Sequence, residues 1–128
     1  IGIAVKNLDQ ANALFSKLLG RQHYKVEEVP SEGVRTAFYD VAGLKIELLE
    51  ASTSDSPIAR FLEKRGEGIH HLAFEVTNIQ ESISEFEKKG FESVHSEPKK
   101  GADNKMICFL HPRTTGGVLV ELCQEIKK

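Results

Sequence analysis

The chain contains an internal repeat, which limits the folds open to it more than any other feature. Residues 1–10 align without a gap with residues 72–81, an offset of 71 positions. After a small insertion, residues 45–49 align with residues 119–123, and both segments contain a Glu-Leu pair. Self-similarity of this kind indicates two copies of one supersecondary unit. The fold must therefore be one that is built from two similar halves.

Local patterns predict the same order of elements in each half. Alternating apolar residues from position 1 to 5 are typical of a half-buried strand. Asn7 and Asn78 each precede an amphipathic run and are predicted helix N-caps. The apolar helical face of the first half comprises Leu8, Ala11, Phe15, Leu18 and Leu19. Further strands are predicted near 22–29, 34–40 and 43–50, and near 69–76, 91–96, 104–111 and 117–124.

These elements predict an α+β fold with two tandem βαβββ modules that form a curved, cup-like mixed sheet. We expect one domain, residues 1–128, with a first module over 1–53 and a second over 69–128. Ser56 followed by Pro57 is typical of a helix start, so a linker helix is predicted over 56–64.

Composition excludes several classes of function. The net charge of -2 argues against a nucleic-acid-binding protein, which is usually basic. No apolar run approaches the about 20 residues that span a membrane. The two cysteines, Cys108 and Cys123, lack the spacing of a disulfide scaffold or a zinc site. We therefore expect a cytoplasmic protein with reduced cysteines.

Three potential metal ligands share one side of the predicted sheet. Strand alternation places Leu72, Phe74 and Val76 against a helix and His71 on the opposite face. The same reasoning places Val118, Val120 and Leu122 against a helix. It turns Glu47 and Glu121 away from the helices, together with His71. Imidazole and carboxylate ligands suit divalent first-row metals. His70, on the other face from His71, is predicted to be structural.

Several motifs are similar to those of a known family. These motifs are Asp55-Ser-Pro-Ile-Ala59, Gly66-Glu-Gly-Ile-His-His-Leu72, Phe109-Leu-His-Pro112 and Gly116-Gly-Val-Leu-Val-Glu-Leu122. With them, the two halves resemble the vicinal oxygen chelate superfamily and, within it, the methylmalonyl-CoA epimerase family. The resemblance covers essentially the whole chain.

The resemblance implies a metal site and a reaction. Glu47, His71 and Glu121 would be the metal ligands, and Glu121 and Glu47 the catalytic residues. The cofactor would be a divalent ion, with cobalt preferred over manganese, zinc or nickel. The reaction would interconvert (2R)- and (2S)-methylmalonyl-CoA by proton transfer at C2 through an enolate that the metal stabilises. The family also forms homodimers.

Two departures from the family pattern are visible. The family's first ligand is a histidine directly before the position of Ile1, where this sequence begins. We expect that histidine in the native chain. Some relatives also carry a glutamate where this chain has Thr36, so the identity of one base is open.

Other activities occur on the same fold. A glyoxalase I would use a similar two-glutamate site to move a proton within a glutathione hemithioacetal. An extradiol dioxygenase would use two histidines and one carboxylate, a pattern that Glu47 argues against. A protein that only sequesters a ligand needs no ionisable cluster. Two carboxylates in a cleft are costly without a cation, which favours a metal enzyme.

Overall fold

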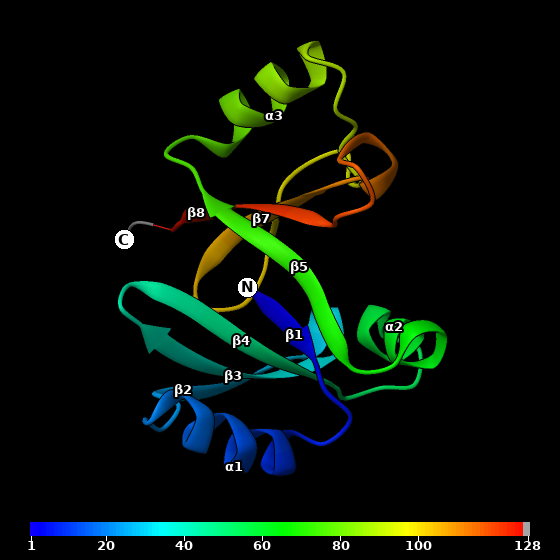
Figure 1. The fold of residues 1–128 in the computed structure, drawn as a ribbon. Coiled ribbons are helices and arrows are strands. Elements are labelled where there is room, and N and C mark those ends of the chain that lie inside the picture. Colours follow the sequence, from blue (N-terminus) through cyan, green and yellow to red (C-terminus); the bar gives the residue numbers. More distant parts are fainter. Residues whose placement is uncertain (127–128) are drawn as a thin grey trace. The chain divides into compact units, whose positions relative to one another are not determined.

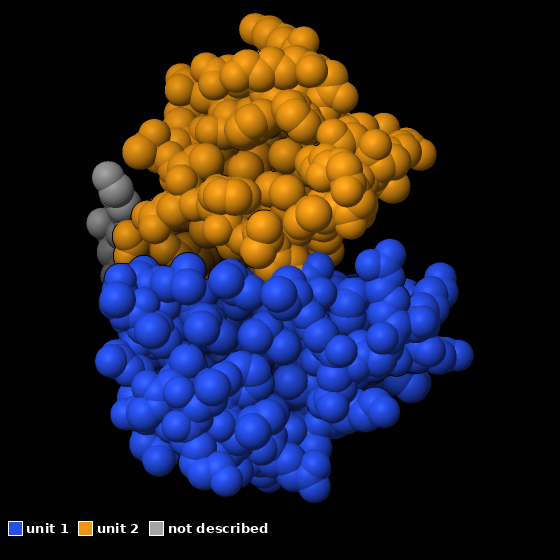
Figure 2. All heavy atoms as spheres, viewed as in Figure 1, with its two compact units in different colours: residues 1–70 blue, residues 71–128 orange. Residues whose placement is uncertain are grey.

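The computed structural model describes residues 1–126. Residues 127 and 128, the end of the predicted second module, lie outside the described residues. The chain divides into two compact units, residues 1–70 and residues 71–128, coloured blue and orange in Figure 2. The boundary falls within strand β5 (Gly68–Glu75).

Unit 1 is a βαβββ module followed by a helix (Figure 1). Its sheet has the order β2-β3-β4-β1, in which β1 is parallel to β4 and the other pairs are antiparallel. The elements are β1 (Gly2–Ala4), α1 (Leu8–Leu19), β2 (Lys25–Val29), β3 (Val34–Val41), β4 (Leu44–Ala51) and α2 (Pro57–Arg65).

Unit 2 repeats this topology. Its sheet has the order β5-β8-β7-β6, with β5 parallel to β8 and the other pairs antiparallel. After β5 follow α3 (Ile79–Lys88), β6 (Lys99–Lys100), β7 (Lys105–Leu110) and β8 (Val120–Glu125). The predicted α+β class with two βαβββ modules is therefore confirmed. Within the described residues, no helix has the length and apolar character needed to cross a membrane.

The predicted helix starts are also confirmed. The Asn7 side chain accepts a hydrogen bond from the backbone N–H of Gln10 at 2.9 Å. The Asn78 side chain does the same for Glu81 at 3.1 Å. Each bond satisfies one of the N–H groups that a helix leaves without a partner in its first turn.

A second pair of contacts ties each helix to its sheet. Glu50, on β4, accepts a hydrogen bond from the backbone N–H of Leu8 at 2.7 Å. Gln124, on β8, accepts the equivalent bond from Ile79 at 2.7 Å. Glu50 and Gln124 each lie three residues after a candidate glutamate ligand. The strands that carry the candidate ligands are thus fixed to the helix starts in the same way in both units.

Each helix packs on one face of its own sheet. The core of unit 1 joins α1 to the sheet through Val5, Leu8, Ala11, Ala37, Tyr39 and Leu48. The core of unit 2 joins α3 to the sheet through Ile79, Ile83, Cys108, Leu110 and Leu122. Because side chains alternate along a strand, the residues between these core positions lie on the face that is turned away from the helix.

One predicted strand is wrong. Residues 91–96 form no strand, and only an isolated bridge joins Ser93 to Leu110. The short β6, at positions 99–100, takes the place of this strand in the ladder. The 91–98 segment contains two serines and a proline and few β-branched residues, so it has little tendency to extend the sheet.

Three apolar residues expected against the helices are exposed instead. Leu18 is 70% exposed because it lies at the edge of the apolar stripe of α1. Phe74 is 55% exposed, since α3 packs mainly on β7 and β8 rather than on β5. Val118 is 42% exposed because β8 begins only at Val120.

Candidate functional site

His71 and Glu121 come together in unit 2. β5 and β8 run parallel, with Leu72 beside Val120 and Ala73 beside Glu121. This register brings His71 Nε2 to 3.7 Å from Glu121 Oε2. Only 4% of the His71 side chain and 13% of the Glu121 side chain are exposed. The structure therefore places two of the three predicted ligands beside each other in a nearly buried position.

Phe109 is next to both members of this pair. Local sequence patterns do not predict this position. It lies directly across from Glu121 in the antiparallel pairing of β7 and β8. Its ring contacts the imidazole of His71 edge to face, with 5.8 Å between ring centroids. The neighbouring residue Cys108 belongs to the core beneath α3, so Phe109 faces the other way. Phe38 and Phe109 are 71 positions apart, the offset of the repeat, and this correspondence is the sequence signal that distinguishes Phe109.

The geometry of the pair fits a bound cation. A separation of 3.7 Å is too long for a hydrogen bond. Ligand bonds to zinc-like ions are about 2.0–2.2 Å long, so two ligands of one ion can lie up to about 4 Å apart. The nitrogen and oxygen donors are those that divalent first-row metals accept. Among residues 1–126, no three His, Cys, Asp or Glu side chains are gathered closely enough to hold a metal ion, so the structure shows two potential ligands and no third.

Glu47 lies in unit 1, in the position that corresponds to Glu121. It is directly across from Phe38 in the pairing of β3 and β4, as Glu121 is across from Phe109. Leu48, the next residue, is part of the core beneath α1, so Glu47 is on the opposite face. The repeat thus extends to strand register. That Glu47 joins His71 and Glu121 at one metal remains a prediction.

Charged side chains surround Phe38 on the face of the sheet that carries Glu47. The Nζ atoms of Lys25 and Lys45 lie 5.6 and 5.5 Å from the centroid of the Phe38 ring. Lys25 also forms an ion pair with Glu27 at 3.2 Å. Such contacts of ammonium groups with an aromatic face are attractive. The face of the unit 1 sheet that carries Glu47 is therefore polar and charged, in contrast to the apolar face beneath α1.

Two further histidines of the family-like motifs make structural contacts. The ring of His70 packs edge to face on Phe61, with 5.0 Å between centroids; its structural role stays a prediction. His111 Nδ1 accepts a hydrogen bond from the backbone N–H of Arg113 at 3.2 Å. This bond caps the short 3-10 helix Pro112–Thr114. Neither histidine needs to take part in catalysis to account for its position.

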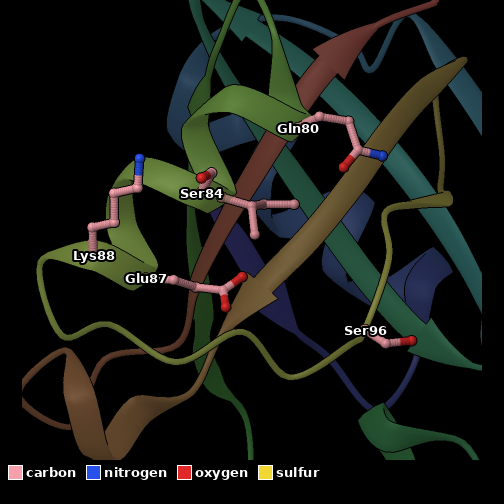
Figure 3. A pocket seen from close by; sticks show the side chains of 6 residues that line it. Gln80, Ser84, Glu87, Lys88 and Ser96 are labelled. Carbon is pink, nitrogen blue, oxygen red and sulfur yellow. The ribbon is translucent and has the colours of Figure 1, made fainter.

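A hollow of about 440 Å³ lies on unit 2 away from the predicted ligands. Figure 3 shows Gln80, Ser84, Glu87 and Lys88 projecting from α3, with Ser96 on the loop that faces the helix. Ile83 also lines it. A second hollow of about 330 Å³ lies on unit 1 and is lined by Asn12, Ala13, Ser16, Lys17 and Gln22. Neither hollow contains a predicted site residue.

The cysteines are not catalytic candidates in this structure. Neither Cys108 nor Cys123, the two cysteines of the chain, forms a disulfide. Burial raises the pKa of the Cys108 thiol, and the nearby Glu87 carboxylate raises it further, against an opposing hydrogen bond to the His95 backbone. Cys108 is therefore a protonated core thiol at neutral pH.

The chain matches a protein family and several curated relatives. A family model described as Glyoxalase/Bleomycin resistance protein/Dioxygenase superfamily matches residues 1–109. An uncharacterized protein of Bacillus subtilis, YqjC, is 39% identical over 97% of this chain and 89% of its own length. Human mitochondrial methylmalonyl-CoA epimerase is 42% identical over 97% of this chain and 71% of its own length. The ethylmalonyl-CoA/methylmalonyl-CoA epimerase of Cereibacter sphaeroides is 40% identical over 97% of this chain and 94% of its own length.

Solved structures lead to the same family. Methylmalonyl-CoA epimerase from Mycobacterium tuberculosis superposes with a TM-score of 0.92 at 34% identity, covering 98% of this chain and 85% of that one. A methylmalonyl-CoA epimerase in complex with methylmalonyl-CoA and NH4+ superposes with a TM-score of 0.90 at 32% identity. The match covers 98% of this chain and 91% of that one. These matches span nearly the whole chain, and the vicinal oxygen chelate fold is confirmed. The chain belongs to the methylmalonyl-CoA epimerase family of the Glyoxalase/Bleomycin resistance protein/Dioxygenase superfamily.

Proposed function

We propose that this protein is a metal-dependent epimerase that interconverts (2R)- and (2S)-methylmalonyl-CoA. The observation that carries the proposal is the nearly buried His71–Glu121 pair, with 3.7 Å between Nε2 and Oε2. It lies within two of the motifs that resemble the epimerase family. Two relatives that bear this name are 42% and 40% identical to this chain over 97% of its length, and one solved relative holds methylmalonyl-CoA.

The proposed metal ligands are Glu47, His71 and Glu121. His71 supplies an imidazole nitrogen, and its ring packs edge to face on Phe109. A divalent cation held by these residues would supply a positive charge that stabilises the enolate oxygen when the C2 proton is removed. Cobalt is the preferred ion, and manganese, zinc and nickel also suit this donor set.

Glu121 and Glu47 are the proposed proton-transfer groups. Epimerisation requires a base on one face of C2 and an acid on the other. The repeat supplies one carboxylate from each unit, each directly across from a phenylalanine. Glu121 is only 13% exposed, so bulk water has little access to a proton that it holds. We assign the main proton transfer to Glu121 and the complementary transfer to Glu47.

The proposed substrate class is a malonyl-CoA that carries a 2-alkyl group. The name of the Cereibacter sphaeroides relative includes both ethylmalonyl-CoA and methylmalonyl-CoA. Activity on both ethylmalonyl-CoA and methylmalonyl-CoA would indicate a pocket that accepts several alkyl groups, whereas activity on methylmalonyl-CoA alone would indicate one that fits only a methyl group.

We further propose that the protein acts as a homodimer in the cytoplasm, in propionate metabolism. Light scattering after gel filtration measures the mass of the assembly.

The test begins with one pure epimer of methylmalonyl-CoA and protein loaded with cobalt. Appearance of the other epimer is followed by a stereospecific coupled assay. Glu121→Gln removes the proposed base while it keeps the size of the side chain. Glu125→Gln, at an exposed position of the same strand, is the matched control.

The proposal predicts that the native protein and the Glu125→Gln variant convert the epimer, while Glu121→Gln is nearly inactive. A protein that binds cobalt and leaves the epimer unchanged would not be an epimerase of this substrate. The hemithioacetal of methylglyoxal and glutathione is tested in parallel, because turnover of that compound alone would identify a glyoxalase I-like lyase. Binding without turnover of either compound would identify a ligand-sequestering protein.

A further inference from the structure

Thr36 has a buried hydroxyl group that the fold itself does not use. The residue is 0% exposed. Its Oγ1 atom has no hydrogen-bond partner among the described residues. A buried polar group without a partner lowers the stability of the fold. Valine has nearly the same shape and suits a strand equally well, so packing alone gives no reason for a threonine at this position.

Thr36 lies on the same face of unit 1 as Glu47. On β3, Ala37 and Tyr39 belong to the core beneath α1, which turns Thr36 and Phe38 to the other side. Thr36 is directly across from Leu49 on β4, and Phe38 is directly across from Glu47. β3 and β4 run side by side in Figure 1. Thr36 and Glu47 are therefore diagonal neighbours on one face of the sheet.

The distance between diagonal neighbours permits a hydrogen bond. Their Cα atoms lie about 7–8 Å apart in an antiparallel pair, which long side chains span. A glutamate is long enough to bring an oxygen to a threonine hydroxyl across this diagonal. The other carboxylate next to Thr36 is that of Glu27, its direct neighbour on β2. Glu27 forms an ion pair with Lys25 at 3.2 Å, and the double-mutant cycle below distinguishes between the two carboxylates.

The repeat provides an internal comparison. The residue of unit 2 that corresponds to Thr36 is Ile107, at the same offset that relates Phe38 to Phe109. Ile107 is 5% exposed and lies directly across from Cys123. Unit 2 thus fills this position with an apolar side chain, as a buried site favours. The hydroxyl in unit 1 is a departure from the repeat on the face that carries Glu47.

We propose that Thr36 is a positioning residue for Glu47, whose carboxylate accepts a hydrogen bond from the Thr36 hydroxyl when it holds a divalent cation. Carboxylates that bind metals are commonly oriented by such a second contact, and loss of the contact weakens metal binding about 10–100-fold. The inference rests on the proposed function, because that proposal makes Glu47 a ligand. It adds a residue outside the predicted ligand set.

The experiment measures cobalt affinity by competition with a chelator, in the absence of substrate. Thr36→Val removes the hydroxyl and keeps the shape, and Thr36→Ser keeps the hydroxyl. We expect Thr36→Val to bind cobalt about 10–100-fold more weakly and Thr36→Ser to bind like the native protein. The thermal midpoint of Thr36→Val should be unchanged or higher, because the variant loses an unpartnered buried hydroxyl.

A double-mutant cycle identifies the group through which Thr36 acts. In a Glu47→Ala background, Thr36→Val should cause no further loss of cobalt affinity. In a Glu27→Gln background, Thr36→Val should weaken cobalt binding as much as it does in the native protein. Equal cobalt binding by Thr36→Val and the native protein would overturn the inference, as would a loss that persists in the Glu47→Ala background.

The same measurements separate this inference from the proposed function. If the native protein binds cobalt and Thr36→Val binds it equally well, only the role of Thr36 is refuted. If the native protein binds no divalent cation, metal-dependent catalysis and the role of Thr36 both fall. A lower thermal midpoint in Thr36→Val with unchanged cobalt affinity would show that the hydroxyl has a structural role only.

Discussion

His71 Nε2 lies 3.7 Å from Glu121 Oε2, although the two residues come from opposite ends of unit 2. The parallel pairing of β5 with β8 creates this proximity, although α3, β6, β7 and a short 3-10 helix separate the two strands along the chain. At this spacing the two atoms form no hydrogen bond with each other. A cation between them would neutralise the carboxylate and use the imidazole nitrogen, so the pair is the part of the structure that most directly indicates a metal site.

Replacement of His71 should therefore reduce metal affinity. We expect His71→Ala to weaken cobalt binding by at least about tenfold, because a ligand contributes at least as much as the groups that orient it. His70→Ala is the matched control, since His70 packs on Phe61 on the other side of the strand. This control should lower thermal stability and leave cobalt affinity unchanged. Calorimetric titration of both variants measures the difference, and equal affinities would exclude His71 as a ligand.

The capping contact of α3 should contribute measurably to stability. Asn78→Ala removes the side-chain acceptor for the backbone N–H of Glu81. The expected cost is about 1 kcal/mol of the free energy of unfolding. Thr77→Ala, one residue earlier and exposed, should have little effect. Urea denaturation measures both variants, and an unchanged midpoint for Asn78→Ala would show that the cap is not needed for α3.

Two leucines of α1 should differ sharply in their contribution to stability. Leu8 is 0% exposed and Leu18 is 70% exposed. Leu8→Ala should cost about 2–5 kcal/mol because it leaves a cavity in the core of unit 1. Leu18→Ala should change the free energy of unfolding by no more than about 0.5 kcal/mol. Similar losses in the two variants would contradict the packing of α1 described above.

Cys108 should make stability fall at alkaline pH. Burial raises the pKa of its thiol in the folded protein, whereas an unfolded cysteine titrates near about pH 8.5. The folded state then holds the proton more tightly, so this contribution is complete below about pH 8.5 and is lost as the pH rises through the folded-state pKa. Denaturation between about pH 8 and about pH 10 should show a steeper loss in the native protein than in Cys108→Ala. Parallel slopes would contradict the raised pKa.

Much of the fold follows from local sequence patterns. Asn7 and Asn78 act as helix caps where the sequence predicts them. The repeat predicts that Glu47 and Glu121 occupy equivalent positions, and each proves to lie across from a phenylalanine. Alternation along the strands also places both glutamates on the faces turned away from the helices. These features depend on residues close in sequence or on the repeat itself, which is why they are predictable.

Other features depend on packing between distant segments. The sequence does not reveal that α3 packs mainly on β7 and β8, so the exposure of Phe74 was not foreseen. The strand expected at 91–96 is reduced to a single bridge at Ser93, because a strand also requires a partner in register. The contact between His71 and Phe109 likewise requires the pairing of β7 with β8, which local patterns do not specify.

The most direct test of the account is exchange of the C2 proton of methylmalonyl-CoA in deuterated water. NMR or mass spectrometry follows the exchange with cobalt present and again with a chelator. We expect rapid deuterium uptake with cobalt, loss of uptake with the chelator, and almost none with Glu121→Gln. Exchange that continues at the same rate in the presence of the chelator, or in Glu121→Gln, would contradict metal-dependent proton transfer by Glu121.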